Sequence, residues 1–497
     1  MDALPEALFR AEQVRELDRR AIQDYGIPGY ELMQRAAAAA LDLLGRSWPQ
    51  ARRIAVVCGG GNNAGDGYVL ARLARAQGLA VDVLALADPT SLKGDAATAW
   101  HDWDAAGGSV QAFDAAVLEG VDLIVDALLG TGLQRPVEGE WRMAIEAINR
   151  QPLPVLALDL PSGLSADRGT VLGAAVRAAA TLTFIGLKQG MFTAEGREHC
   201  GRIHFHDLGV PAQLYGSVVP SAWRLSEDIL GRMLPPRRRG QHKGDCGHVL
   251  VIGGDRGMAG AARMAGEAAA RTGAGLVSVA TRGEHAPLVG ATRPELMCHA
   301  VDRPADLVRL VARADVLAIG PGLGQGSWAR ALLAVALESD RPLVLDADAL
   351  NLLAREPCRR DDWILTPHPG EAARLLGVTA GEVQADRFAA LDALVEAYGG
   401  AFILKGAGTL VRAADGPAYV CDAGNPGMAS GGMGDVLTGV VAALVAQGLP
   451  LADAARTGTY LHARAGDLAA AEGERGLLAL DLMPALRRLA NPAAVAP

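Results

Sequence analysis

The chain has 497 residues, of which 50% are hydrophobic, 21% are charged and 4% are aromatic, and its formal net charge is −9. This composition supplies apolar material for full-sized cores and excludes extended disorder, and the length predicts two to four domains. The acidic balance and the scarcity of aromatic rings argue against nucleic acid and against a membrane surface as partners.

The cysteines and the N-terminal segment indicate the compartment. Six cysteines are scattered without a C-x-x-C pair, which favours reduced thiols over a disulfide framework or a zinc site. Residues 1–20 carry mixed charge and no apolar core of a signal peptide, so we expect a cytoplasmic protein. The longest uncharged apolar run, residues 436–452, is too short for a spanning helix and predicts a buried one. We also expect a homo-oligomer.

Lysine is rare among the 47 basic residues, which are otherwise arginine. In such a composition the surviving lysines are candidates for positions that need a compact ammonium group. Each lies beside a glycine or one residue from it, although chance among 61 glycines explains this equally well. The four lysines are Lys93, Lys188, Lys243 and Lys405.

The first half of the chain alternates between short aliphatic runs and helical stretches, after a leading helical segment that reaches about residue 40. This alternation predicts a mostly parallel sheet covered by helices. We expect strands at 54–58, 81–86, 123–127, 155–160 and 180–185, and a helix at 68–76. Polar or glycine-rich loops follow four strands, and because ligands bind beyond the carboxyl ends of parallel strands, these loops predict one pocket. They are residues 59–67, 126–136, 159–163 and 186–190.

Near residue 207 the alternation stops, and a proline-containing stretch with the run Arg237–Arg239 follows. We interpret it as a solvated linker. A second alternating half predicts a dissimilar α/β domain with strands at 249–252, 277–280, 316–319, 343–345, 363–366, 402–404 and 419–421. The expected organisation is a domain over 1–215, a linker over 216–240 and a domain over 241–497.

The first glycine-rich loop formally satisfies the dinucleotide fingerprint, with Gly59, Gly61 and Ala64 at the required spacing. The fingerprint is weak alone, and Asp66 near the helix start would repel a pyrophosphate. Three other strand-end residues offer only hard oxygen ligands, which suits an alkali or alkaline-earth cation. Simple capping of helices and turns is the alternative explanation for them. They are Asn63, Asp126 and Ser162.

The motifs of the first half together resemble the NAD(P)H-hydrate epimerase domain over about residues 10–215. They are the segments 28–33, 61–67, 130–133 and 159–163. The family loop usually has glycine where this chain has Ala64. The resemblance implies a potassium ion at Asn63, Asp126 and Ser162, and a catalytic or binding role for Asp159. It implies contacts with the hydrated nucleotide at Asn62, Asn63, Ala64, Gly65, Asp66, Gly130, Thr131, Gly132, Leu133, Gln134, Arg135, Pro136 and Asp159.

In the second half, a glycine-rich segment, residues 423–435, opens an apolar helix that reaches about residue 447. Glycine amides and a helix N-terminus favour anions, so Asp435 within this segment fits a base that takes a proton from an attacking hydroxyl. It could otherwise be an ordinary first-turn acid. Lys405 with the loop to Thr409 is a second candidate for phosphate contact, and it is not a Walker A motif. His368 stands between two prolines that stiffen its backbone, although a core histidine is the alternative.

The glycine-aspartate helix start resembles ribokinase-like kinases, and further motifs resemble the ADP-dependent NAD(P)H-hydrate dehydratase over about residues 225–490. These motifs are residues 242–244, 257–262, 273–277, 294–297, 320–324, 366–371, 405–409 and 434–435. The resemblance implies hydrated nucleotide near Ala261, Gly322, His368 and Asp435. It implies ADP near Lys405, Gly406, Ala407, Gly408, Thr409 and Gly434, with magnesium.

The two motif sets, in this order, predict a bifunctional α/β enzyme of nicotinamide cofactor repair, with a doubly wound Rossmann-like domain and a ribokinase-like domain. The first domain would epimerise the R and S hydrates of NADH or NADPH. The second would dehydrate the S form with ADP as co-substrate, giving NAD(P)H, AMP and phosphate. Two alternatives stay open: the second half could be a vitamin or sugar kinase, and the first could be a non-catalytic nucleotide-binding module.

Overall fold

The computed structural model describes residues 4–492, and the chain forms two compact units, Met1–Trp223 and Arg224–Pro497. The division falls within the segment 216–240 that we interpreted as a linker. This segment is not free chain, because Leu225, Ile229 and Leu230 are buried in the core of the second unit. Arg237 of the arginine run donates to the carbonyl oxygen of Gly273. Short apolar stretches between the prolines therefore anchor a segment whose composition resembles that of a linker.

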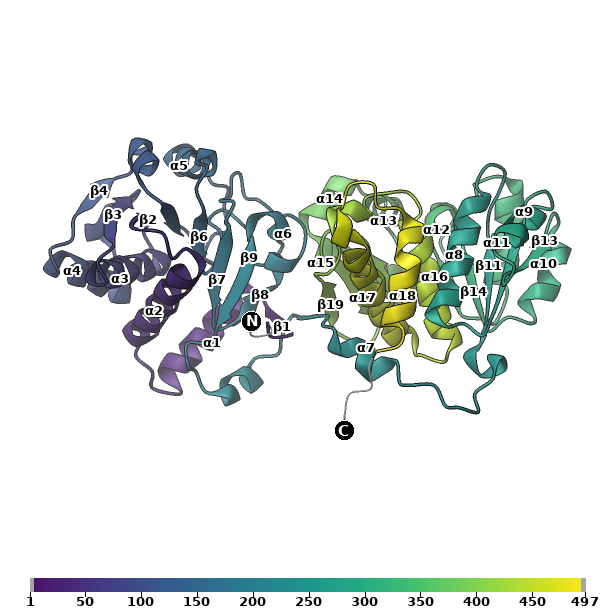
Figure 1. Ribbon diagram of the computed structural model, residues 1–497. Coiled ribbons are helices and arrows are strands. Elements are labelled where there is room, and N and C mark those ends of the chain that lie inside the picture. The colour runs from purple at the N-terminus through teal and green to yellow at the C-terminus, as the bar shows by residue number, and fades with distance from the viewer. Residues whose placement is uncertain (1–3, 493–497) are drawn as a thin grey trace. The chain divides into compact units, whose positions relative to one another are not determined.

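The first unit is built on a parallel sheet with the strand order β4-β3-β2-β5-β6-β7-β9. The order reverses direction at β2, as in a doubly wound fold, which confirms the predicted fold class. Figure 1 labels these strands, except β5, and the helices beside them. The strands are β2 (Arg53–Cys58), β3 (Ala80–Ala85), β4 (Val110–Ala112), β5 (Leu123–Ala127), β6 (Val155–Leu158), β7 (Ala180–Phe184) and β9 (Arg202–His206).

Helices cover both faces of this sheet. Ile54, Val56 and Cys58 of β2 share one buried cluster with α2, α3 and α4, whereas Ala55 and Val57 share a second cluster with α5. Alternate residues of a strand point to opposite faces, so a strand that is apolar throughout requires cover on both sides. The helices are α1 (Ala11–Gln23), α2 (Gly29–Ser47), α3 (Asn62–Ala76), α4 (Gly94–Ala105), α5 (Gly139–Arg150) and α6 (Gly196–His199).

A few short elements complete the first unit. Strand β1 (Ala7–Phe9) pairs in parallel with β8 (Leu187–Lys188) and antiparallel with β10 (Ala222–Arg224). The strand that carries Lys188 is therefore hydrogen-bonded to β1. The short 3-10 helices are η1 (Pro89–Ser91), η2 (Ala115–Gly120), η3 (Gln189–Phe192) and η4 (Ala212–Ser217).

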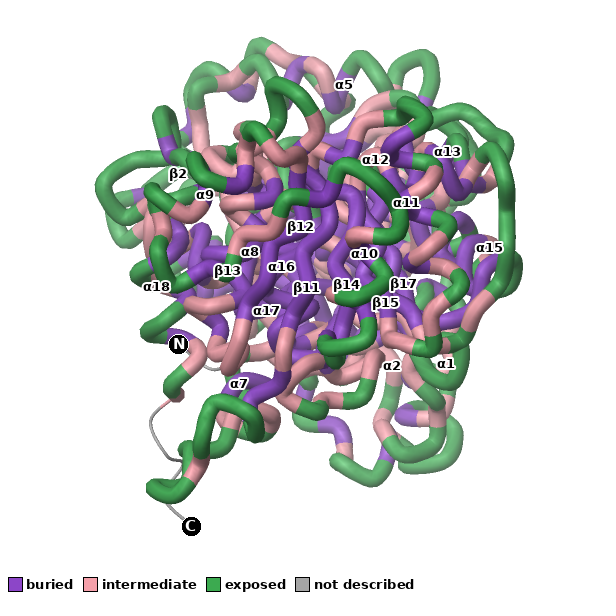
Figure 2. Tube along the Cα trace, turned by 90° about the vertical axis from the view of Figure 1, so that its right-hand side faces the viewer, coloured by how far each residue is buried: buried purple, intermediate pink, exposed green. Residues whose placement is uncertain are grey.

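The second unit contains a sheet with the order β13-β12-β11-β14-β15-β16-β17-β18-β19, parallel as far as β17 and antiparallel from there. Figure 2 shows that β11, β12 and β14 are largely buried. The strands are β11 (His248–Ile252), β12 (Leu276–Thr281), β13 (Met297–Ala300), β14 (Val316–Ile319), β15 (Leu343–Leu345), β16 (Trp363–Leu365), β17 (Ala401–Leu404), β18 (Thr409–Ala413) and β19 (Ala418–Cys421).

The apolar run 436–452 forms two helices rather than one. Helix α16 (Met433–Ala446) is buried almost all round, as its uniformly apolar sequence requires, and α17 (Leu451–Ala469) begins after Gly448 and Pro450 end the first helix. No helix among the described residues is long and apolar enough to cross a membrane. The other helices are α7 (Asp228–Met233), α8 (Ala259–Thr272), α9 (Ala286–Thr292), α10 (Pro304–Val311), α11 (Ser327–Leu337), α12 (Ala347–Leu353), α13 (Pro369–Leu376), α14 (Ala380–Ala385), α15 (Arg387–Tyr398) and α18 (Leu482–Leu489), with 3-10 helices η5 (Lys243–Cys246), η6 (Pro426–Met428), η7 (Ala470–Glu472) and η8 (Ala479–Asp481).

Candidate functional site

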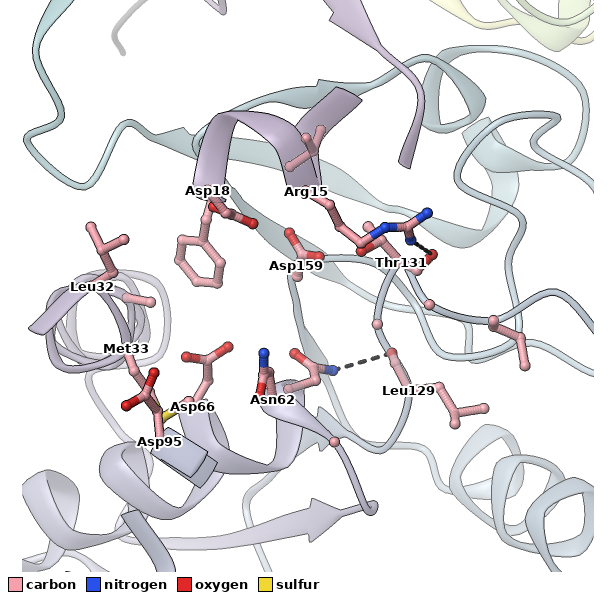
Figure 3. Close-up of a pocket in the computed structure, with 18 of the residues that line it drawn as sticks. Arg15, Asp18, Leu32, Met33, Asn62, Asp66, Asp95, Leu129, Thr131 and Asp159 are labelled. Atoms are coloured by element: carbon pink, nitrogen blue, oxygen red, sulfur yellow. Dashed lines mark hydrogen bonds between the residues drawn. The ribbon is translucent and has the colours of Figure 1, made fainter. Parts of the chain in front are cut away.

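A cavity of about 790 Å³ lies in the first unit, beyond the carboxyl ends of β2, β5 and β6. This is the point where the strand order reverses, at which open α/β sheets bind ligands. Figure 3 shows carboxyl and amide side chains on its walls. Arg15 of α1 donates to the carbonyl oxygen of Thr131 over 3.4 Å and so ties α1 to the loop after β5.

Most of the residues that we predicted at the first site line this cavity: Asn62, Asn63, Asp66, Gly130–Arg135 and Asp159. Ala64, Gly65 and Pro136 are not among the lining residues. Ala64 is fully buried in the core, and Gly65 packs so closely against Met33 that an added Cβ would lie 2.5 Å from the Met33 Cε. These two residues therefore pack α3 against the core, and their contact with substrate, like that of Pro136, stays a prediction.

The glycine-rich loop is shorter than we predicted, because α3 begins at Asn62 rather than at residue 68. Ala64 accordingly has a helical backbone with a negative φ, and it does not need the glycine usual in the family. The expectation that Asp66 stands as a charge before the helix amides is also wrong. Asp66 lies within the second turn, and burial raises its pKa well above the ordinary value, with the charges of Asp159 and Asp18 adding to the effect.

Asp159 follows β6 in a strained turn. Its φ is +65°, and the Leu160 N–H donates to the Leu158 carbonyl oxygen over 2.8 Å, which closes a three-residue γ-turn. The Asp159 carboxylate forms an ion pair with Lys188, whose side chain is fully buried. Lys188 also donates to the Thr183 hydroxyl over 2.8 Å. Backbone strain of this kind is typical of functional positions, and here it turns the carboxylate into the cavity.

The three predicted cation ligands lie together at the ends of β2, β5 and β6, and Asn63 also lines the cavity. The Ser162 hydroxyl and N–H donate to the two Asp126 carboxylate oxygens over 2.6 and 2.8 Å, and the Asn63 amide donates to the Leu129 carbonyl over 3.1 Å. The Asn63 Oδ1 is buried and has no hydrogen-bond partner among the described residues. Burial raises the pKa of Asp126 to about 6, although hydrogen bonds from Ser162 and Leu128 oppose the rise. The site thus offers an unpaired oxygen and a buried carboxylate without a positive counter-charge.

The second unit holds an ion pair between half-buried Lys405 and buried Asp346 at 2.7 Å. Thr366 and Thr438 donate to the two Asp346 oxygens over 2.8 and 2.9 Å. Burial acts to raise the pKa of Asp346, but the Lys405 ammonium and these hydrogen bonds outweigh it and lower the pKa. The Glu371 carboxylate lies 3.8 Å from the same ammonium, and its pKa is raised by burial.

Asp435 stands beside this ion pair in the first turn of α16. The helix begins after Gly432, whose φ of +94° favours glycine, and a Cβ on Gly434 would lie 3.3 Å from both the Asp346 carboxylate and the Lys405 ammonium. Burial raises the pKa of Asp435 to about 7, Asp346 adds to the rise, and Lys405 opposes it. Asp435 therefore changes charge near neutral pH, as a general base should.

The remaining predicted residues of the second site lie on loops at the strand ends. Gly322 has a φ of +57° and packs against Ala261, which brings the loops after β11 and β14 together at the reversal of strand order. His368 is exposed, and its Nδ1 accepts the Gly370 N–H over 2.9 Å, so it caps α13 and is not a core residue.

The loop after β17 lies above a buried arginine. Arg387 donates to the carbonyl oxygens of Leu404 and Lys405 over 3.1 and 3.2 Å, and its guanidinium leaves no space for a Cβ on Gly406. Thr409 donates to the Gly406 carbonyl over 3.0 Å and closes the loop. Ala407 lies at the exposed tip of this loop, and Gly408 lies at its buried base.

Sequence reasoning missed several residues of both sites. Asp346 was not predicted because no glycine-rich motif surrounds it in the sequence. Asp18 and Asp95 line the first cavity, but they belong to helices for which the sequence did not indicate which face is turned toward a site. Lys188 could be singled out in the sequence, because it is one of only four lysines and follows a predicted strand. Its ion-pair partner Asp159 was not predicted. The residues that make these sites polar thus come from segments far apart in the sequence.

Comparisons with known proteins match both units. Residues 249–488 match the NAD(P)H-hydrate dehydratase family, and residues 29–190 match the family described as YjeF-related protein N-terminus. The bifunctional NAD(P)H-hydrate repair enzyme of Coxiella burnetii is 52% identical over 98% of this chain and 99% of its own. The chain belongs to the family of bifunctional NAD(P)H-hydrate repair enzymes.

The Escherichia coli member of this family is 47% identical over 99% of this chain and 95% of its own. A ribokinase-like protein of Enterococcus faecalis, which is 30% identical, superposes with a TM-score of 0.51 over 54% of this chain and 94% of its own. The predicted repair-enzyme family and the ribokinase-like fold of the second unit are thereby confirmed. The matched family of the second half is the dehydratase rather than a vitamin or sugar kinase.

Proposed function

We propose that the second unit (unit 2) removes water from hydrated NADH or NADPH at the expense of ADP. We further propose that the first unit (unit 1) interconverts the two epimers of the hydrate. The observation that carries the first activity is Asp435, set in the first turn of α16 beside the Lys405–Asp346 ion pair. This arrangement places a carboxylate that can act as a base beside a half-buried ammonium and helix amides, which together suit phosphoryl transfer to a hydroxyl.

In the dehydration, the Asp435 carboxylate takes the proton of the C6 hydroxyl as its oxygen attacks the terminal phosphorus of ADP, and AMP leaves. The new phosphate ester then leaves C6 as phosphate, a proton is lost from C5, and the C5–C6 double bond of the nicotinamide ring is restored. Phosphorylation is needed because hydroxide is a poor leaving group. Asp435 contributes the proton transfer, and the glycine amides stabilise the transferred charge.

The surrounding loops provide binding groups for the two substrates. We assign the hydrated ring to the region of Ala261, Gly322, His368 and Asp435. We assign ADP to the loop Lys405–Thr409 and to Gly434, where an ammonium and glycine amides can meet phosphates. Among the described residues no three acidic, histidine or cysteine side chains converge on a metal site, so magnesium would be held by the phosphates and one or two carboxylates.

For the epimerase we assign the cavity of unit 1 to the hydrated ring and its nucleotide, with Asp159 as a residue that binds the ring or exchanges a proton with it. Potassium fits the oxygens of Asn63, Asp126 and Ser162, because the Asn63 Oδ1 has no other partner and the buried Asp126 lacks a counter-charge. Bound there, it would neutralise Asp126 and fix the loops after β2, β5 and β6.

The test is incubation of both hydrate epimers with the protein and ADP, with each epimer followed by chromatography. We expect both epimers to disappear and NADH and AMP to appear in equal amounts. A stable phosphate ester without NADH would indicate a kinase instead. Disappearance of the S epimer alone, beyond the uncatalysed rate of interconversion, would refute the epimerase assignment.

A further inference from the structure

We propose that Asp18, on the inner face of α1, is a second proton-transferring residue of the epimerase and acts together with Asp159. This inference rests on the function proposed for unit 1. Asp18 lines the cavity with Val14 and Ile22, which lie one turn before and one turn after it on the helix. Among the described residues, no hydrogen bond or ion pair reaches its carboxyl group.

The cavity is arranged for a polar ligand independently of its carboxyl groups. Asn63 lines the cavity and is only 7% exposed, and its side-chain oxygen has no hydrogen-bond partner within residues 4–492. A Cβ on Gly130 would lie 3.5 Å from Asn63 and 3.9 Å from an Asp159 oxygen, so these groups converge on one small region. A buried polar atom without a partner indicates a site that a ligand or an ion completes.

Asp18 and Asp159 face different partners within this cavity. The Asp159 carboxylate forms the ion pair with buried Lys188, whereas Asp18 forms no ion pair with any residue that the structure describes. Burial raises the pKa of Asp18 to about 7, Lys188 opposes the rise, and Asp159 adds to it. Figure 3 shows the carboxyl groups of Asp18 and Asp159 near one another, with Asp66 and Asp95 on the other side. The titratable and charged groups around Asp18 are Arg15 on α1, Asp66 on α3, Asp95 on α4, Asp159 after β6, Lys188 on β8 and Tyr215 on η4.

The other two carboxyl groups suit this role less well. Burial raises the pKa of Asp66 well above the ordinary value and so favours its neutral form, which suits donation of a hydrogen bond better than exchange of a proton. Asp95 lies against the backbone at the start of α2, where a Cβ on Gly29 would fall 2.2 Å from its Oδ2. Asp18 is the carboxyl group that both faces the cavity and changes its protonation near neutral pH.

Two adjacent carboxyl groups fit the chemistry of a hemiaminal carbon, since C6 of the hydrate bears both the hydroxyl and the ring nitrogen N1. Asp159 takes the hydroxyl proton, C6=O forms, and the C6–N1 bond breaks with its electron pair passing to N1, which receives a proton from Asp18. Rotation about the C5–C6 bond presents the other face of the aldehyde. N1 then attacks C6 while Asp18 takes back the N1 proton and Asp159 returns its proton to oxygen, so nothing is consumed.

The experiment compares full-length Asp18→Asn, Asp18→Glu and the control Glu12→Gln, which removes a charge from an exposed position of the same helix. We expect Asp18→Asn to lower kcat for epimerisation by about 100-fold or more, because a general acid contributes on that scale. Wild-type kcat/KM should fall as pH rises above about 7, and Asp18→Asn should lose this limb. Asp18→Glu should retain the limb and part of the rate, and Glu12→Gln should match the wild type.

Dehydration of the S epimer by the same preparations reports whether each variant is folded, since it uses the other unit. In water labelled with heavy oxygen, ring opening predicts epimerised product that keeps its original C6 oxygen. An Asp18→Asn variant within about threefold of the wild type, an unchanged pH limb, or one labelled oxygen per inversion would overturn the inference. A wild-type protein that does not epimerise at all would instead overturn the function proposed for unit 1.

Discussion

The ammonium of Lys188 donates to the carboxylate of Asp159, and the two residues lie 29 positions apart, on β8 and after β6. The Lys188 side chain is fully buried, whereas the Asp159 side chain keeps 19% of its surface exposed on the cavity side. The second unit also pairs a lysine with a strand-end carboxylate, but there the Asp346 side chain is buried and the Lys405 side chain keeps 21% of its surface exposed. In both units the lysine thus balances the charge of a carboxylate at a strand end.

Asp159→Ala should cripple epimerisation and leave dehydration of the S epimer unchanged, because Asp159 lines the cavity of unit 1 and lies outside unit 2. It should also destabilise unit 1 by about 3 kcal/mol, since removing one partner leaves the buried Lys188 without its counter-charge. Asp159→Asn keeps the hydrogen-bonding oxygen and tolerates the positive φ, but it cannot accept a proton. Rates of both reactions and thermal unfolding of the two variants check this.

A nearly active Asp159→Asn variant would assign the residue to binding rather than to proton transfer. Retention of the wild-type epimerisation rate by Asp159→Ala would exclude both roles.

Asp435→Asn should lower dehydration by about 100-fold or more and leave epimerisation intact, because it removes the base but neither the glycine amides nor Lys405. The base is active when ionised, and burial raises the pKa of Asp435 to about 7. The wild-type kcat/KM should therefore rise with pH through about 7 and level off above it. Steady-state NADH formation across this range is the measurement, with ADP binding by calorimetry as the control. A flat profile would argue against Asp435 as the base.

Potassium should raise the thermal stability of unit 1, and more strongly at pH 8 than at pH 5. The direction of this pH dependence follows from Asp126. Burial raises the pKa of Asp126 to about 6, and below that pH a proton competes with the cation for the carboxylate. Asp126→Asn should abolish the potassium effect and weaken epimerisation. Unfolding curves in potassium chloride and in tetramethylammonium chloride provide the comparison. Equal curves in the two salts would mean that no cation binds there.

Ala64→Gly should destabilise unit 1 by about 1 kcal/mol, because this residue lies within α3 with a helical backbone, where glycine is less favourable than alanine. The substitution restores the glycine usual in the family loop, yet we expect no gain in epimerisation, since Ala64 is buried and does not line the cavity. Denaturant unfolding and the epimerisation rate check both expectations. A faster and equally stable variant would show that the position needs backbone freedom.

The sequence by itself predicted the parallel strands, the two α/β domains in their order and the family, because hydrophobic periodicity and strand-end motifs are local. Residues 123–127, 316–319 and 343–345 form strands with the predicted bounds. The motifs from which we predicted roles for Asp435 and Asp159 are local as well, since each is a short segment whose glycines or proline constrain the backbone.

The tertiary structure alone decided which distant residues meet. The helix that begins at Asn62, rather than at residue 68, depends on the close packing of Gly65 and Gly67 against Met33, Cys58 and Ala127, which no local pattern encodes. Lys405 and Asp346 are 59 positions apart, and they pair because β15 and β17 flank β16 in one parallel sheet. Asp18 reaches the cavity because α1 packs over the strand ends. Strand order and helix packing set these contacts, and both are fixed by burial of the whole core rather than by any single segment.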